Sequence, residues 1–445
     1  MSDSPRRHRV LLAIFAVALL LRLAYGLSQD HDAVFSAGND SAWYLQNGIW
    51  MVTNDLPGPP TTAPLYLLFI GAWQRLLSPD GSAIVAIRIC QAILSTLTCF
   101  FAYRLAWSAS GERRAGLLAA AALAVAPVFI IEAAQVLTET LYIFFVMAAL
   151  WLYVDFAAPP AAPDRTPWRA LVAAGIVFGL ATLTRAIPLL FPFGLLIHLL
   201  LLRGWRRGLV QAAALIAPFV LVVSTWTIYN LVAWDTFVIG GDGFASFLYI
   251  GAREWEGPEA TDQQLAEDVP ELSPDELTNP DRDDVFLTGA QRAISEDPVG
   301  YVTRRVKQLA SAYLQPHGTT FFDGPSLKDM ARDWLTDDRS LNGLRDLISG
   351  QGFWPKLALY LFHYTALVAG AAGMWITRRR WRSTLPLLGF ALYTTLVHLF
   401  LLALPRYLFP AEPVWWIFAA AALVALWDWA ASRRVSARQT AGSAA

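Results

Sequence analysis

Four charged residues lie at the borders of apolar segments, where a charge is costly and is a candidate for function. Asp40 follows the first apolar segment, and Glu139 opens the fourth. Arg185 ends the fifth apolar segment, and Arg406 opens the tenth. Carboxylates accept protons and arginines bind anionic oxygens, so these residue types together suit proton transfer beside an anion. Their joint occurrence predicts a functional site.

Each of these residues also has a purely structural interpretation. Arg185 and Arg406 are placed where arginines snorkel to phospholipid headgroups. Glu139 can cap its helix together with Thr138, and Asp40 can cap the helix that follows it. Taken singly, the structural interpretation of each residue is at least as strong as the functional one. The coincidence of two acids and two arginines on one side of the membrane favours a site.

The elements that position these residues are membrane helices. Of the 445 residues, 56% are apolar and only 16% are charged, against about 25% in soluble proteins. The composition predicts an all-α polytopic membrane protein, and no nucleic acid partner is expected. Ten apolar segments are long enough to cross about 30 Å of hydrocarbon. They cover about residues 10–27, 84–107, 114–131, 137–157, 168–184, 186–203, 209–232, 355–377, 383–403 and 407–430.

Arginine clusters fix the expected orientation. They occur before the first span and at alternating ends of the later spans, as the bias of basic residues toward cytoplasmic loops requires. The protein is therefore expected in the inner or plasma membrane of the cell, with both termini in the cytoplasm. The candidate residues are then extracytoplasmic. The expected parts are a transmembrane catalytic module at 1–232 with a large outer loop at 28–83, an outer helical segment at 233–354, transmembrane helices at 355–432, and a disordered cytoplasmic tail at 433–445.

The first outer loop contains two amphipathic pieces, residues 40–53 and 64–77. Neither is long enough to cross a bilayer comfortably, and both carry tryptophan or tyrosine. We predict that they are helices lying in the membrane interface.

Several short motifs occur in a recognisable order. They are Asp40-Ser41-Ala42-Trp43-Tyr44, Pro64-Leu65-Tyr66, Thr138-Glu139, Thr182-Leu183-Thr184-Arg185 and Pro405-Arg406-Tyr407. In this order the chain resembles GT-C fold glycosyltransferases of the protein-mannosyltransferase superfamily, which are family 39-like. The resemblance covers about residues 10–430 and implies a GT-C-like bundle of about ten transmembrane helices.

The resemblance implies a glycosyltransferase that takes a hexose or pentose from a polyprenyl-phosphate donor. The sugar would pass, with inversion, to an extracytoplasmic acceptor, which is a protein, a lipid or a glycan. Asp40 matches the catalytic acid of the family, and Glu139 matches its second acid, which in relatives helps to hold acceptor or metal. The chain departs from the family pattern at Asn39, where an acidic pair is common, and at residues 233–354, which stand in place of a late soluble domain.

The chemistry suits these groups. A sugar hydroxyl attacks well only when a base accepts its proton, and Asp40 is the predicted base. Arginines suit the phosphate of the leaving group because they keep their charge. Arg185 and Arg406 are the predicted donor-phosphate ligands, together with Tyr407. Arg22, inside the first span, either snorkels or reaches the same phosphate, and Lys307 is a further candidate. The polyprenyl-phosphate sugar and membrane lipids are the expected partners.

No cofactor is required by this reading, although a divalent metal is possible. Asp30, His31, Asp32 and Asp40 lie in one loop, and carboxylate oxygens suit Mg²⁺ or Mn²⁺. The same acids also suit an exposed linker. The alternative function is a transporter or flippase for a lipid-linked or anionic substrate, in which the charges would line a path. Inverted repeats and broken helices would favour that alternative, and the sequence shows neither.

Overall fold

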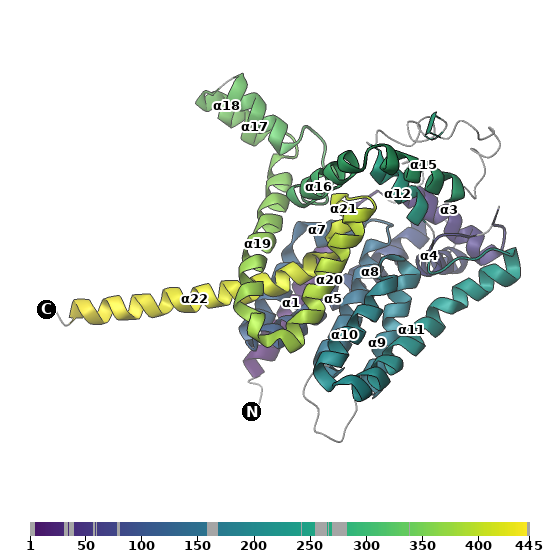
Figure 1. The fold of residues 1–445 in the computed structure, drawn as a ribbon. Helices are drawn as coiled ribbons and strands as arrows, with labels where there is room; N and C mark the ends of the chain where they lie inside the picture. The colour runs from purple at the N-terminus through teal and green to yellow at the C-terminus, as the bar shows by residue number, and fades with distance from the viewer. Residues whose placement is uncertain are drawn as a thin grey trace.

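The computed structural model of the protein describes most of the chain as a bundle of helices (Figure 1). Every regular element among the described residues is helical, which confirms the predicted all-α class. The residues described are 5–30, 34, 40–56, 58, 60–77, 81–157, 168–241, 243–253, 265, 267–268, 283–337 and 339–442.

Five segments of the described chain are long and apolar enough to cross a membrane. They confirm a multi-pass membrane protein. They are His8–Ser28 in α1 (Pro5–Ser28), Ser82–Ser110 in α5 (Gly81–Ser110), α11 (Trp205–Trp234), Phe353–Phe400 and Pro405–Arg434. The fourth consists of α19 (Phe353–Thr377) and α20 (Trp381–Phe400), which a turn of three arginines joins. Two shorter apolar helices are α9 (Trp168–Thr184) and α10 (Phe191–Arg203).

Two expected spans differ from a single regular α-helix. The segment predicted at 114–131 is split into α6 (Arg113–Val125) and α7 (Pro127–Glu132). Proline has no amide hydrogen and its ring clashes with the preceding turn, so α6 ends just before Pro127. The segment predicted at 137–157 consists of α8 (Glu139–Leu152) and a π-helical turn at Tyr153–Ala157. A broken helix is therefore present that the sequence interpretation missed.

The core of the bundle lies between α5, α6, α8, α9 and the last long helix, α22 (Glu412–Gly442). Alanine, leucine and phenylalanine side chains make up most of it. On α19, a Cβ at Gly373 would lie 1.9 Å from the backbone oxygen of Phe418 in α22. The two helices can approach this closely only because the residue is glycine.

Two helices of the first outer loop have the predicted bounds. They are α3 (Asp40–Thr53) and α4 (Pro64–Leu77). They pack closely, since a Cβ at Gly71 would lie 2.2 Å from the backbone oxygen of Gly48. The buried hydroxyl of Tyr66 on α4 donates a hydrogen bond of 2.8 Å to Gln91 of α5, which anchors the pair to the bundle. Their placement in the membrane interface stays a prediction.

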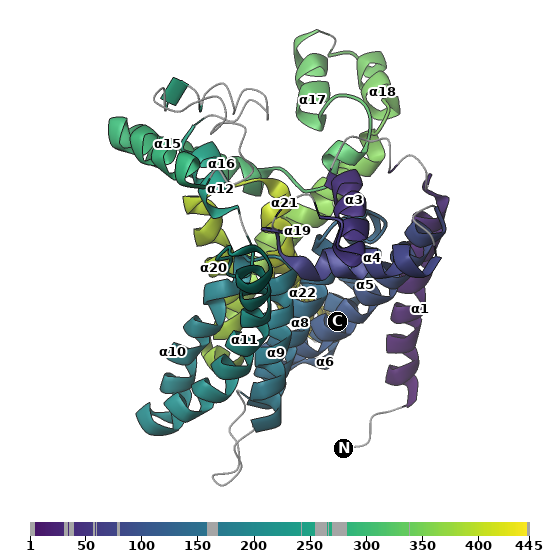
Figure 2. The same cartoon turned by 90° about the vertical axis from the view of Figure 1, so that its right-hand side faces the viewer.

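The chain between α11 and α19 forms short helices at one end of the bundle, opposite the N-terminus (Figures 1 and 2). These helices are α12 (Phe244–Ala252), α15 (Asp283–Glu296), α16 (Pro298–Leu314), α17 (Leu327–Thr336) and α18 (Leu341–Ser349). In both views α3, α12 and the short helix α21 (Pro405–Leu408) lie near this end, and α17 and α18 protrude beyond it. Several distant segments of sequence therefore meet at this end.

The last helix is longer than expected. A disordered tail was predicted from residue 433, but α22 continues to Gly442 and extends past the bundle (Figure 1). Alanine, arginine and glutamine propagate a helix at little cost once it has been nucleated, which explains the continuation. The structure thus assigns helix to residues 433–442, where a disordered tail was expected.

Candidate active site

Glu139 is the centre of a charged cluster. Its side chain is 0% exposed, yet it carries a carboxylate. Arg185 Nη1 donates to Oε1 at 2.5 Å. Arg406 Nε also donates to Oε1 at 2.5 Å, and its Nη2 donates to Oε2 at 3.3 Å. A buried charge is tolerated only when it is paired and hydrogen-bonded, and two guanidinium groups satisfy that condition here.

Helix ends bring these three residues together. Glu139 is the first residue of α8, where the positive end of the helix dipole favours a carboxylate. Arg185 directly follows the last residue of α9. Arg406 lies in α21, after α20 ends at Phe400. The side chains of three separate helix ends therefore converge on one point.

Asp40 lies beside this point and differs from Glu139 in its exposure. Its side chain is 63% exposed, and it is the first residue of α3. Arg406 Nη1 donates to its Oδ2, so one guanidinium group bridges both acids. The structure thus brings together Asp40, Glu139, Arg185 and Arg406, the residues that the sequence grouped.

The predicted phosphate ligand Tyr407 also lies here and lines the cavity, with its ring near Arg185. The centroid of the Tyr407 ring is 5.5 Å from Arg185 Cζ. The ring of His398, from α20, stacks on the Tyr407 ring, and the two centroids are 5.4 Å apart. The sequence interpretation missed His398, because a lone histidine near the end of an apolar helix carries no signal of its own.

Tyr44 is a further wall residue, from the motif that begins at Asp40. Its ring packs edge-on against Tyr66, with centroids 5.3 Å apart. Burial raises the pKa of the Tyr44 phenol, and the positive charge of Arg185 partly opposes that rise. The hydroxyl group therefore stays protonated and can donate a hydrogen bond at neutral pH.

Arg22, predicted either to snorkel or to reach the donor phosphate, does not join this cluster. It is buried, and its Nε donates to Ser95 Oγ at 2.8 Å. Its two terminal nitrogens donate to the backbone oxygens of Leu123 and Ala124 at 2.9 and 3.0 Å. These carbonyls end α6 and have no helical partner, because Pro127 starts the next helix. Arg22 therefore caps the broken helix.

Lys307, the other outlying candidate, is exposed on α16 and does not line the cavity described next. Its neighbour Arg305 is buried instead and donates to the backbone oxygen of Leu401. That contact joins α16 to the turn that precedes Arg406.

A cavity of about 1000 Å³ opens from the charged cluster. Asp40, Arg185 and Arg406 form its charged wall, and the remaining walls are largely apolar. The apolar lining comes from helix ends and loops: Ile187, Leu189, Leu190, Ile239, Phe244, Phe247, Leu248, Val397, Phe400 and Leu401. A cavity with one charged wall and long apolar walls suits an amphiphilic ligand with an anionic group.

The loop that enters α12 borders the same cavity and requires glycine. Gly241 and Gly243 have φ values of 156° and 113°, which other residues rarely adopt. A Cβ at Gly241 would also lie 2.8 Å from the amide nitrogen of Ala63. Asp242, between these glycines, and Asn39, the departure from the family pattern, lie outside the described residues.

The described residues contain no group of three histidine, cysteine or acidic side chains arranged to hold a metal ion. His31 and Asp32, named as possible ligands, lie outside the described part of the chain. Both Glu139 oxygens already accept hydrogen bonds from arginines. A second buried acid, Glu132, pairs with His317, a contact that no pattern in the sequence predicts.

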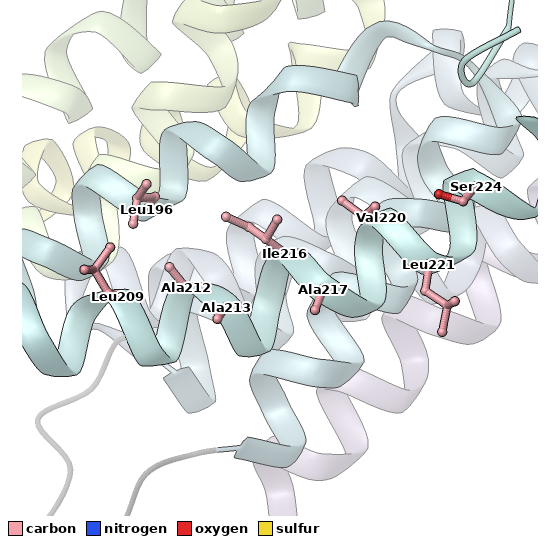
Figure 3. Close-up of a pocket in the computed structure, with 9 residues that line it drawn as sticks. All are labelled: Leu196, Leu209, Ala212, Ala213, Ile216, Ala217, Val220, Leu221 and Ser224. Carbon is pink, nitrogen blue, oxygen red and sulfur yellow. The ribbon is translucent and has the colours of Figure 1, made fainter. Parts of the chain in front are cut away.

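A second hollow, on the surface of α10 and α11, has a different character (Figure 3). Its volume is about 610 Å³. Ser224 is the one polar side chain among the nine residues that line it, and the others include Leu196, Ile216 and Leu221. Because no charge lies in its wall, this groove has the character of a lipid-facing surface.

Residues 59–229 match the family described as "Dolichyl-phosphate-mannose-protein mannosyltransferase". No curated protein sequence matches the chain. Among solved structures, archaeal oligosaccharyltransferase AglB from Archaeoglobus fulgidus, in complex with an inhibitory peptide and a dolichol-phosphate, aligns with a TM-score of 0.54 and 16% identity. The alignment covers 98% of this chain and 52% of AglB, so the chain spans about half the length of that protein.

ArnT from Cupriavidus metallidurans bound to undecaprenyl phosphate aligns with 14% identity over 95% of this chain and 78% of ArnT. Its TM-score of 0.37 is too low to support an inference. The likeness to AglB establishes the fold of the chain. Glu139 and Arg185 lie within residues 59–229, the part that matches the family.

Proposed function

We propose that this chain, whose residues 59–229 match the dolichyl-phosphate-mannose-protein mannosyltransferase family and whose fold is similar to that of AglB, is a membrane glycosyltransferase with a polyprenyl-phosphate-linked donor. The sugar, a hexose or a pentose, passes with inversion to an acceptor on the extracytoplasmic side. One observation carries the proposal. Asp40, Arg185 and Arg406 form the charged wall of a large, otherwise mainly apolar cavity, and the buried Glu139 pairs with both arginines behind that wall.

The cavity supports a lipid-linked donor. Its apolar walls suit isoprene units, and the guanidinium groups of Arg185 and Arg406 suit a phosphate beside them. The Tyr407 ring packs beneath Arg185 and helps to fix the direction of that guanidinium group. AglB holds a dolichol-phosphate in its structure, which agrees with a donor of this class.

Asp40 is the proposed base. The acceptor hydroxyl oxygen attacks the anomeric carbon, its proton passes to Asp40, and the bond between that carbon and the phosphate oxygen breaks. A positioned base of this kind contributes about 10²- to 10⁴-fold to the rate. The departing polyprenyl phosphate carries the bonding electron pair away, and Arg185 and Arg406 stabilise its charge. No step is assigned to a metal.

Glu139 has a different proposed role from that of a second base. Its carboxylate is buried and both its oxygens accept hydrogen bonds from Arg185 or Arg406. We therefore assign it the positioning of these two arginines. The proposed acceptor is a glycan, a lipid or a protein. The peptide bound to AglB does not assign the acceptor of this chain, because AglB is about twice as long.

Mass spectrometry of envelope glycans and glycolipids tests this function directly. Cells with the protein should contain a species heavier by one sugar residue that is missing from cells without it. Restoring the wild-type protein should restore that species, and restoring Asp40→Asn at equal protein level should not. Identical spectra with and without the protein would refute the proposed activity.

The transporter or flippase alternative predicts a different result. Membranes that hold the protein would then move the labelled donor across the bilayer without consuming it. Consumption of the donor in detergent, where no second compartment exists, would exclude transport as the sole function.

A further inference from the structure

Arg406 is shared between two acids that hold it unequally. Its Nε and Nη2 bind Glu139, and its Nη1 binds Asp40. Glu139 is completely buried and has Arg185 as a second partner. Asp40 is mostly exposed, and Arg406 is its one hydrogen-bonding partner in the described part of the chain. Of the two carboxylates, Asp40 is therefore the one that is bound more weakly to Arg406.

The cluster has no charge to spare for an additional anion. Two carboxylates and two guanidinium groups sum to zero. A phosphate that binds Arg406 adds negative charge beside Asp40, at a border where charges are only partly screened. The phosphate must therefore replace a carboxylate on Arg406. If Glu139 lost Arg406, its buried carboxylate would be incompletely compensated, which is costly. Asp40 is mostly exposed and can turn toward solvent.

We propose that the donor phosphate displaces Asp40 from Arg406 and that this displacement frees Asp40 to act as the base. The inference rests on the proposed function and adds a coupling between donor binding and base activation. While the pair is intact, Oδ2 of Asp40 accepts a hydrogen bond from Arg406, so that oxygen is occupied and does not face an acceptor hydroxyl. After displacement, the proton from the acceptor hydroxyl can move to the free Asp40 carboxylate as the sugar is transferred.

The coupling makes a prediction that a simple catalytic role does not. Removal of the Asp40 charge should abolish transfer and yet improve donor binding, because the phosphate loses its competitor. A base that never touched Arg406 would leave the affinity for the donor unchanged when replaced. One substitution should therefore lower the rate of sugar transfer and raise the affinity for the donor.

The test titrates farnesyl phosphate, a short polyprenyl phosphate, into the purified protein in nanodiscs with EDTA present. We expect Asp40→Asn and Asp40→Ala to bind about fivefold more tightly than wild type, the scale of one partly exposed ion pair. Asp55→Asn is the matched control, since it removes the same charge just after α3, and it should bind within about twofold of wild type. Arg406→Gln should bind at least about tenfold more weakly.

The outcomes distinguish the two ideas. Equal affinity of wild type and both Asp40 variants would overturn the displacement and leave the donor class standing. A different result would overturn it in favour of a metal bridge: the Asp40 variants bind more weakly than wild type, and replacing EDTA by Mg²⁺ strengthens the binding of wild type only. Failure of wild type and every variant to bind would overturn the donor class and the displacement with it. Thermal unfolding of each variant confirms that the titrated protein is folded.

Discussion

Two arginines of this molecule, the buried Arg22 and the partly exposed Arg406, serve different purposes, and their partners show why. Arg22 is surrounded by backbone oxygens at the end of α6 and by a serine hydroxyl. Arg406 binds two carboxylates, and one side of it faces a cavity. Neutral carbonyls in a closed site leave no room for another ligand. Carboxylates at an open wall can be exchanged for a phosphate.

The comparison shows that the type of partner, rather than the burial of a charge, distinguishes a functional charge from a structural one. Arg22 lies inside α1 and contacts the break between α6 and α7, whereas Arg406 lies in the short helix α21 between α20 and α22. Only Arg406 has a second arginine, Arg185, bound to the same acid. The following predictions run from the largest expected effect to the smallest.

Replacement of Glu139 should remove the order of the whole cluster. Glu139→Ala leaves Arg185 and Arg406 without their buried anion, and we expect sugar transfer to disappear. The free energy of unfolding should fall by about 2–4 kcal/mol, below the full cost of a completely buried pair because both arginines are partly exposed. Transfer assays and thermal unfolding of the purified variant measure both effects. Wild-type activity in Glu139→Ala would contradict the positioning role.

Replacement of Arg22 should damage stability alone. Arg22→Met leaves the backbone oxygens of Leu123 and Ala124 buried without donors, which should lower the free energy of unfolding by about 2–4 kcal/mol. The activity of each folded molecule should stay within about twofold of wild type, because Arg22 does not touch the cavity. A selective loss of donor affinity in this variant would show that the two arginines are not separate in function.

A conservative change at Arg406 should weaken the donor affinity without unfolding the protein. Lysine keeps the charge but cannot bind two oxygens with a planar fork, so Arg406→Lys should bind the polyprenyl-phosphate donor about tenfold more weakly. The apparent KM for the donor measures this change. An unchanged KM would mean that Arg406 anchors α21 and does not bind phosphate.

The apolar groove of α10 and α11 provides the smallest expected effect. Leu221 is 70% exposed in that groove, so Leu221→Ala should change stability by less than about 0.5 kcal/mol. Donor affinity and transfer should be unchanged. A clear loss of donor affinity in Leu221→Ala would place the isoprenoid chain in the groove rather than in the charged cavity.

Much of this comparison could be predicted from the sequence because helix borders are visible in it. The apolar lengths and arginine clusters located Asp40, Glu139, Arg185 and Arg406 at the ends of helices, and the bounds of α3 and α4 followed from their amphipathic pattern. The contacts of Arg22 could not be predicted, because most of its partners are backbone oxygens, which carry no sequence signal. The pairing of Glu132 with His317 joins residues 185 positions apart and could not be inferred from local pattern.

The most direct test of the central claim measures sugar transfer by Asp40→Asn and by Asp55→Asn in proteoliposomes supplied with a labelled polyprenyl-phosphate sugar and the acceptor found by mass spectrometry. Asp40→Asn should lose at least about 100-fold in rate, the lower range for a positioned base, at an unchanged level of folded protein. Asp55→Asn should match wild type. Transfer by Asp40→Asn at the wild-type rate would contradict the account.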